Sequence, residues 1–150
     1  MKKHRIEKHL ELKAPVSRVW RALTNHHEFG RWFRVKLAGP FKVGKICRGR
    51  ITWPGFEHIM MEVLVEKIEP EHYFAYGWHP YAIDPDVDYS KEPRTLVEFT
   101  LAATKTGTRL TVVESGFEKI PADRRAEAFR MDNSGWSEQL QNIKKYVAKK

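Results

Sequence analysis

From residue 46 onward, apolar residues in this chain change their spacing once, from every second position to every third or fourth. Between residues 46 and 115 they alternate with polar residues in short segments separated by turn residues, which is typical of antiparallel strands with one solvated face. After Pro121 the spacing becomes that of a helix. A chain of strands followed by a long helix that covers them predicts the α+β class.

The expected strands follow one another and are joined by short turns. They cover residues 5–13, 46–53, 56–68, 73–78, 96–101 and 109–115. A helix over 16–24 begins after Pro15, because proline fits a first helical turn. A further short helical turn at 26–30 is expected to end at Gly30. We therefore expect six or seven strands in one curved antiparallel sheet, with two short helices after the first strand.

The last helix is predicted to be amphipathic, about 28 residues and about 40 Å long. Its expected apolar stripe is Ala126, Phe129, Asn133, Trp136, Leu140, Ile143 and Val147. Gly135 inside this helix costs about 1 kcal/mol relative to alanine, which we interpret as a sign of a close approach to the sheet. Because Phe129 and Trp136 are bulky, we expect a cavity between the helix and the sheet.

Length and composition favour one domain over residues 1–150. Residues of hydrophobic type make up 41% of the chain, which is enough for a packed core, and no apolar run approaches the roughly 18 residues of a membrane span. With no apolar leader after Met1, we expect a cytoplasmic protein. Cys47 is the only cysteine and no His-Glu-x-x-His spacing occurs, so we expect no metal and no cofactor.

The net charge of +8 is concentrated near the N-terminus. Residues 1–50 hold 14 Lys and Arg against 3 Asp and Glu, whereas residues 51–100 hold 3 against 10. The basic residues alternate with apolar ones, as on the solvated face of strands and helices, so nucleic-acid binding is not expected. An acidic protein partner on this basic N-terminal face remains an alternative.

Aromatic residues are the first candidates for a ligand site. In the strand at 73–78, Tyr76 and Trp78 share a face, and the intervening residues are small. Phe99 should point the same way from its own strand. Trp32 and the helical residues Phe129 and Trp136 are expected opposite them, where these rings either line a cavity or fill the core.

Glu114 is the polar candidate. It shares its parity with Leu110 and Val112, which predicts a carboxylate among inward-facing residues, and a buried carboxylate needs a partner. Arg130 and Asn133 of the last helix are the expected partners. This polar cluster has three interpretations at this point: an ion pair for stability, a group that orients a ligand, or an acid–base pair.

The segment from residue 79 to residue 94 is a proline-rich acidic loop. At about sixteen residues it is long enough to suggest a lid over a site.

Several motifs occur in a fixed order along nearly the whole chain. They are Ala14-Pro15-Val16-x-x-Val19-Trp20-x-x-Leu23-Thr24, Trp32-Phe33, Glu69-Pro70, Trp78, Gly107-Thr108-x-Leu110-Thr111, Ser115-Gly116-Phe117 and Gly135-Trp136. This series resembles the activator of Hsp90 ATPase homologue 1-like (AHSA1-like) family of the START-like, helix-grip superfamily. The resemblance implies a curved sheet wrapped around the C-terminal helix with a cavity between them, and it leaves the chemistry open.

Three functions are consistent with these features. The first is binding of a small, largely apolar, aromatic or lipid-like molecule, with Glu114, Arg130 and Asn133 at its polar end. The second is an enzyme of cyclase or dehydratase type that uses the same polar residues, as the resemblance allows. The third is a chaperone-assisting interaction domain that uses the basic N-terminal face.

Overall fold

A computed structural model describes residues 5–80, 82, 84 and 86–148 of the chain. Seven strands make up its sheet: β1 (Arg5–Leu12), β2 (Val35–Leu37), β3 (Ile46–Ile51), β4 (Met60–Glu69), β5 (Tyr73–Trp78), β6 (Thr95–Ala103) and β7 (Thr108–Ser115). The helices are α1 (Val16–Thr24), α2 (His26–Phe33), the short 3-10 helix η1 (Phe117–Lys119) and α3 (Ala122–Ala148).

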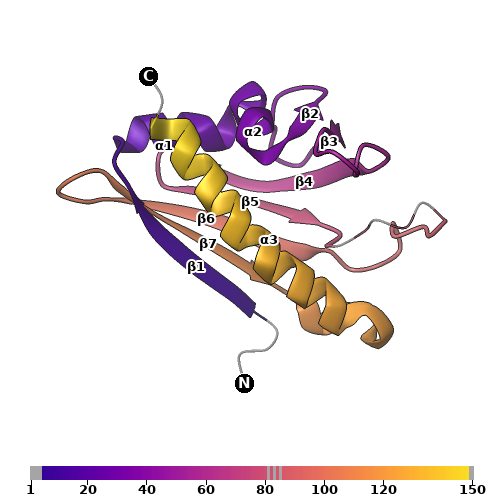
Figure 1. Ribbon diagram of the computed structural model, residues 1–150. Helices are drawn as coiled ribbons and strands as arrows, with labels where there is room; N and C mark the ends of the chain where they lie inside the picture. The colour runs from indigo at the N-terminus through magenta and orange to yellow at the C-terminus, as the bar shows by residue number, and fades with distance from the viewer. Residues whose placement is uncertain (1–4, 81, 83, 85, 149–150) are drawn as a thin grey trace.

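The sheet is antiparallel throughout, in the order β1-β7-β6-β5-β4-β3-β2. Strands β2 to β7 are joined as successive hairpins, and β1 pairs with β7 along its whole length, so that Ile6 lies opposite Glu114. Helices α1 and α2 connect β1 to β2, and α3 crosses the face of the sheet (Figure 1). The α+β class and the long covering helix are therefore confirmed.

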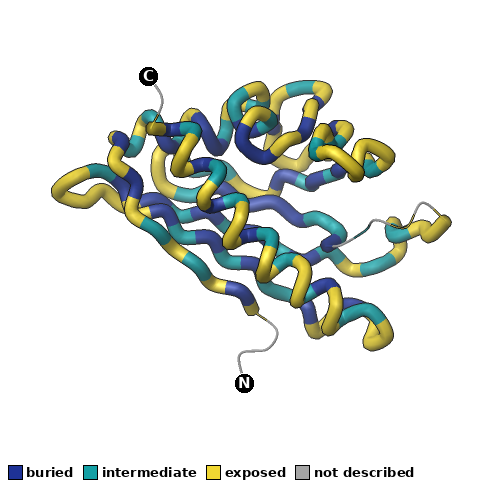
Figure 2. The backbone as a smooth tube through the Cα atoms, in the orientation of Figure 1, coloured by how far each residue is buried: buried dark blue, intermediate teal, exposed yellow. Residues whose placement is uncertain are grey.

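The core lies between the sheet and the helices. Buried residues alternate with exposed or half-buried ones along β1 and β7. Figure 2 shows buried residues gathered in the strands that α3 crosses. Register places Tyr76, Val97 and Glu114 side by side across β5, β6 and β7. Each large apolar side chain buried there contributes about 1.5–3 kcal/mol to the free energy of folding.

Helix α2 is longer than expected, and Gly30 does not end it. The helix continues to Phe33 and ends at Arg34, which adopts a left-handed conformation (φ 71°). Gly30 is required for another reason: a Cβ atom there would lie 2.2 Å from the carbonyl oxygen of Val35. The close turn into β2 explains the glycine, and β2 itself, with three residues, is too short to show an alternating pattern.

Helix α3 confirms the expected length and corrects the expected face. The buried residues of this helix are Ala128, Trp136, Leu140, Ile143 and Val147. Ala126 and Asn133 of the predicted stripe are exposed. Asn133 and Asp132 lie three and four residues before Trp136, and either spacing would place a side chain on the same face of the helix as Trp136. In the structure it is Asp132 that lies on the inner face. Among the described helices, none combines the length and apolar character needed to cross a membrane.

Gly135 does not approach the sheet either. No atom lies within 4 Å of the position that a Cβ atom would take there, because the residue faces a cavity. Gly135→Ala is therefore expected to stabilise the protein by up to about 1 kcal/mol, the difference in helix propensity. Gly30→Ala is the opposing control and should cost about 1–3 kcal/mol through the clash with Val35. Urea unfolding measures both changes. If Gly135→Ala lowers the free energy of unfolding, the claim that the space beside residue 135 is open is wrong.

Candidate functional site

Glu114 is the centre of a buried polar cluster. It projects from β7 toward α3 and is 0% exposed. Its Oε2 atom accepts hydrogen bonds from the Thr95 hydroxyl (2.6 Å) and the Trp78 indole N–H (2.8 Å). Its Oε1 atom accepts one from the indole N–H of Trp136 (2.8 Å). Three donors therefore stabilise the carboxylate, and charge-assisted hydrogen bonds of this kind are about twice as strong as neutral ones.

Asp132 adds a second carboxyl group to the cluster. It lies one helical turn before Trp136, and its carboxyl group is within hydrogen-bonding range of Glu114. Its Oδ2 atom is buried without a hydrogen-bond partner in the described structure. Burial, the negative charge of Glu114 and hydrogen bonding with Glu114 raise the pKa of Asp132 well above its usual value, against a smaller opposite effect of Arg124. Two adjacent carboxylates cannot both ionise at low cost, so the proximity of Glu114 favours the protonated form of Asp132.

Tyr76 completes the polar cluster from β5. Its side chain is fully buried, and its hydroxyl has no hydrogen-bond partner in the part of the chain that the structure describes. Burial, and then the charges of Glu114 and Asp132, raise the pKa of Tyr76 well above its usual value. The hydroxyl therefore stays neutral beside the acid pair.

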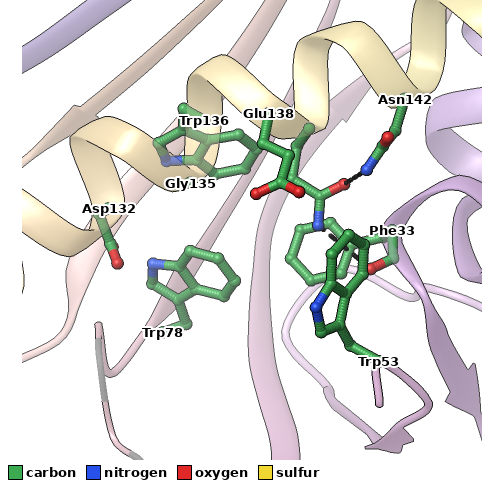
Figure 3. A pocket seen from close by; sticks show the side chains of 9 residues that line it. Phe33, Trp53, Trp78, Asp132, Gly135, Trp136, Glu138 and Asn142 are labelled. Carbon is green, nitrogen blue, oxygen red and sulfur yellow. Dashed lines mark hydrogen bonds between the residues drawn. The ribbon is translucent and has the colours of Figure 1, made fainter. Parts of the chain in front are cut away.

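Two adjoining cavities open beside this cluster. The smaller has a volume of about 200 Å³ and the larger about 520 Å³. The two share five wall residues: Phe33, Trp53, Trp78, Asp132 and Gln139. In Figure 3, Asp132 and Trp136 extend from α3 toward Trp78, and Phe33 and Trp53 lie on the other side of the space. The site is thus a cavity with four aromatic residues and a carboxyl group of raised pKa in its wall.

The larger cavity extends outward from α3. Its outer wall combines the hairpin between β3 and β4 with the 79–94 loop. Three apolar side chains at its rim, Phe56, Met60 and Val87, are 40%, 49% and 45% exposed. Exposed apolar side chains around an opening are common at ligand sites, because a bound molecule covers them.

Arg124 of α3 contacts described residues of the 79–94 segment, of which residues 81, 83 and 85 lie outside the described part of the chain. Its guanidinium group forms an ion pair with Glu92 (2.6 Å for the shortest contact) and donates a hydrogen bond to the Pro80 carbonyl (3.0 Å). It also lies 4.7 Å from the centre of the Tyr89 ring. The Arg124 and Glu92 side chains are 18% and 16% exposed, so solvent screens this pair less than a surface pair.

Arg124→Ala is expected to loosen the loop without unfolding the protein. The variant loses the ion pair, the hydrogen bond to the Pro80 carbonyl and the ring contact. The rate of amide hydrogen exchange over residues 86–92 should therefore rise about tenfold, which corresponds to a decrease of about 1.4 kcal/mol in the free energy of local opening. Arg109→Ala, which removes an exposed ion pair with Glu11, is the control and should leave the loop unchanged. Equal exchange in the Arg124 variant and the native protein would contradict the role of Arg124.

The predicted site residues divide into two groups. Trp78 lines both cavities, Trp136 lines the smaller one, and Glu114 holds both indole rings in place. The remaining aromatic residues pack in the interior: Tyr76 and Phe99 are core residues, the Trp32 indole donates to the Ala22 carbonyl, and Phe129 packs against Phe117. Both indoles are thus oriented through their N–H groups. The Trp78 ring is half-buried, whereas the Trp136 ring is 2% exposed and packs against Phe33, Trp78 and Phe99.

Arg130 and Asn133 do not belong to the cluster, contrary to the prediction. The Arg130 side chain is 70% exposed and pairs with Glu127 at 3.4 Å, and Asn133 is also exposed. Their positions on α3 lie away from the face that carries Asp132 and Trp136. The ionisable neighbour of Glu114 is the carboxyl group of Asp132, whose pKa is raised, instead of a cation.

Sequence reasoning missed Asp132. It precedes Trp136 by four residues, which is a core spacing, and that spacing was the available signal. An aspartate at such a position is seldom buried unless it is paired, and its partner lies on a strand eighteen residues earlier. Phe33 was named only within the Trp32-Phe33 motif, and Trp53 was not singled out at all.

Cysteine and metal chemistry have little support in the described part of the chain. The thiol of Cys47 is buried and donates to the Gly39 carbonyl (3.3 Å), and burial raises its pKa. A buried thiol with a raised pKa is a poor nucleophile. Within residues 5–80, 82, 84 and 86–148, no group of three or more His, Cys, Asp or Glu residues is placed to hold a metal ion.

A curved antiparallel sheet that wraps around a long C-terminal helix, with a cavity between them, defines a protein of the helix-grip class. The chain belongs to the activator of Hsp90 ATPase homolog 1-like family, whose sequence profile matches residues 13–148. No curated protein matches the chain.

Solved structures show the same fold. The protein MLL2253 from Mesorhizobium loti is 26% identical, with a TM-score of 0.76 over 96% of each chain. The Aha1 dimer from Colwellia psychrerythraea is 17% identical, with a TM-score of 0.72 over 95% of each chain. DynU16, from the dynemicin biosynthetic locus, is 21% identical with a TM-score of 0.74; the match covers 97% of this chain and 48% of DynU16. The last two likenesses concern the fold alone.

Proposed function

We propose that this protein binds a small, largely apolar or aromatic molecule in the two cavities beside α3. One observation carries the proposal: about 520 Å³ and about 200 Å³ of adjoining space has walls that combine aromatic and aliphatic side chains with a few polar ones, among them Asp132, whose pKa is raised. Apolar walls supply affinity through burial, and a few fixed polar groups orient the ligand. Asp132 and Trp78, which border both cavities, are the groups that would contact it.

An uncharged fluorescent probe, N-phenyl-1-naphthylamine, tests this proposal. We expect saturable one-to-one binding in the micromolar range, or about −8 kcal/mol at 1 µM. Ile59→Trp adds bulk to the wall of the larger cavity and should weaken binding at least tenfold. Val43→Trp adds the same bulk at an exposed residue away from the cavities and is the matched control. Binding that does not saturate, or that both variants weaken equally, would refute the proposal.

A proton-transfer enzyme is the second candidate. It is favoured by Asp132, because a carboxylic acid kept neutral by burial and by an adjacent carboxylate is suited to act as a general acid. DynU16 comes from the dynemicin biosynthetic locus, and this association is compatible with a role in small-molecule synthesis. Asp132→Asn distinguishes the candidates once a ligand is known: a binding protein should retain most of its affinity, whereas an enzyme should lose turnover.

A further inference from the structure

The smaller cavity has an unusual combination of walls. Four of its nine wall residues are aromatic: Phe33, Trp53, Trp78 and Trp136. Two more, Asp132 and Glu138, are acidic. None of the described residues that line it is basic; Arg94 and His79 line only the larger cavity. The smaller cavity is therefore rich in π-electron surface and carboxyl groups and has no positive charge in its wall.

The two central indoles are oriented so that their rings form the wall. The N–H groups of Trp78 and Trp136 are both used by Glu114, and the ring centres lie 5.7 Å apart with a tilt of 31°. A hydrogen bond from an indole N–H to a carboxylate increases the electron density of the ring. Tryptophan is already the strongest aromatic partner for a cation, and these two rings are further enriched.

Charge in this region also favours a positive ligand. Glu114 is fully buried, and its partners in the described structure are two indoles, a hydroxyl and a carboxylic acid, with no basic side chain within ion-pair distance. One face of the Trp53 ring is already occupied by a cation, because the Arg34 guanidinium lies 4.8 Å from the ring centre. The rings of Phe33, Trp78 and Trp136 contact one another, with centres 5.9, 6.2 and 5.7 Å apart, and leave no space between them. We therefore assign the cation position to the smaller cavity that these rings border, against Trp78 and beside Asp132.

We propose that the smaller cavity is a subsite for an organic cation, specifically a quaternary or alkylated ammonium group, and that the apolar body of the same ligand occupies the larger cavity. This inference rests on the proposed binding function and adds the chemical class of the ligand. Methylated ammonium groups fit it best, because they form cation–π contacts without needing hydrogen-bond acceptors on every side. A carboxylate or phosphate head group is disfavoured, since it would face the Glu138 side chain in the wall and the buried Glu114 behind the two indoles.

Choline and its uncharged isostere 3,3-dimethylbutan-1-ol test the subsite directly. They have nearly the same shape, and the isostere has carbon in place of the charged nitrogen. We expect choline to bind at least tenfold more tightly, equivalent to about 1.4 kcal/mol. An NMR titration that follows the tryptophan indole N–H signals measures both affinities and reports on Trp78 and Trp136. The native protein is used throughout.

Two variants locate the site. Gly135→Leu places a side chain into the smaller cavity from a position with open space, so it should abolish choline binding. Glu138→Gln removes one exposed wall charge and should weaken choline binding about twofold to threefold while leaving the isostere unchanged. Choline binding that is absent, that equals binding of the isostere, or that survives Gly135→Leu would overturn the inference. Saturable binding of N-phenyl-1-naphthylamine in those cases would leave the proposed function standing.

Discussion

Replacing Glu114 with leucine is expected to lower the free energy of unfolding by about 3–5 kcal/mol. Leucine has a similar volume, so the loss comes from hydrogen bonding: the indole N–H groups of Trp78 and Trp136 and the Thr95 hydroxyl lose a buried acceptor. Each donor left unsatisfied costs about 1–3 kcal/mol, and removal of a buried anion offsets part of this. Urea unfolding followed by tryptophan fluorescence measures the change.

The matched control is Glu11→Leu on the neighbouring strand β1. Glu11 forms an ion pair with Arg109 in which both side chains are about half exposed, and such pairs contribute less than about 1 kcal/mol. If the two leucine variants lose the same free energy, Glu114 has no special structural role. A large loss for Glu114 alone would show that this carboxylate organises the wall of the cavity.

Replacing Asp132 with asparagine is expected to stabilise the protein increasingly as the pH rises. In the folded protein the pKa of Asp132 is raised, so this residue holds a proton that the unfolded chain has already released. Rising pH therefore favours the unfolded state from about pH 4, the unfolded value, up to the folded pKa, with a slope of at most about 1.4 kcal/mol per pH unit. Asparagine cannot ionise, and its amide can still donate to Glu114.

The measurement is the difference in unfolding free energy between Asp132→Asn and the native protein from pH 3 to pH 8. It should be smallest at acid pH, where Asp132 is protonated in both states, and should grow through the neutral range. In a Glu114→Leu background the growth should be weaker, because two of the three causes of the raised pKa are gone. A difference that is constant across this range would contradict a raised pKa of Asp132.

Much of the site could be read along single strands. Alternation correctly turned Tyr76, Trp78 and Glu114 inward, because a strand presents every second side chain to the same face. Alternation does not say which inward residues border empty space. Tyr76 and Phe99 are packed by their neighbours, whereas Trp78 lies near the end of its strand, next to the 79–94 loop, where packing ends.

The helical part of the site was harder to predict because helical spacing is ambiguous. Residues 132 and 133 lie four and three positions before Trp136, and both separations suit one face of a helix. Arg130 was favoured as the partner of Glu114 because opposite charges attract, yet the structure pairs it with Glu127 on the surface. A carboxyl group opposite another carboxylate becomes a plausible partner only when burial allows it to keep its proton.

The sequence by itself determined the class of the fold, the inward direction of Glu114 and the length of α3, because these depend on periodicity within one segment. Tertiary structure alone decided that β1 pairs with β7, that Asp132 meets Glu114, and that Gly135 faces a cavity instead of the sheet. Those features depend on how α3 is rotated and where it crosses the sheet. That placement minimises the free energy of the whole core, and no local pattern encodes it.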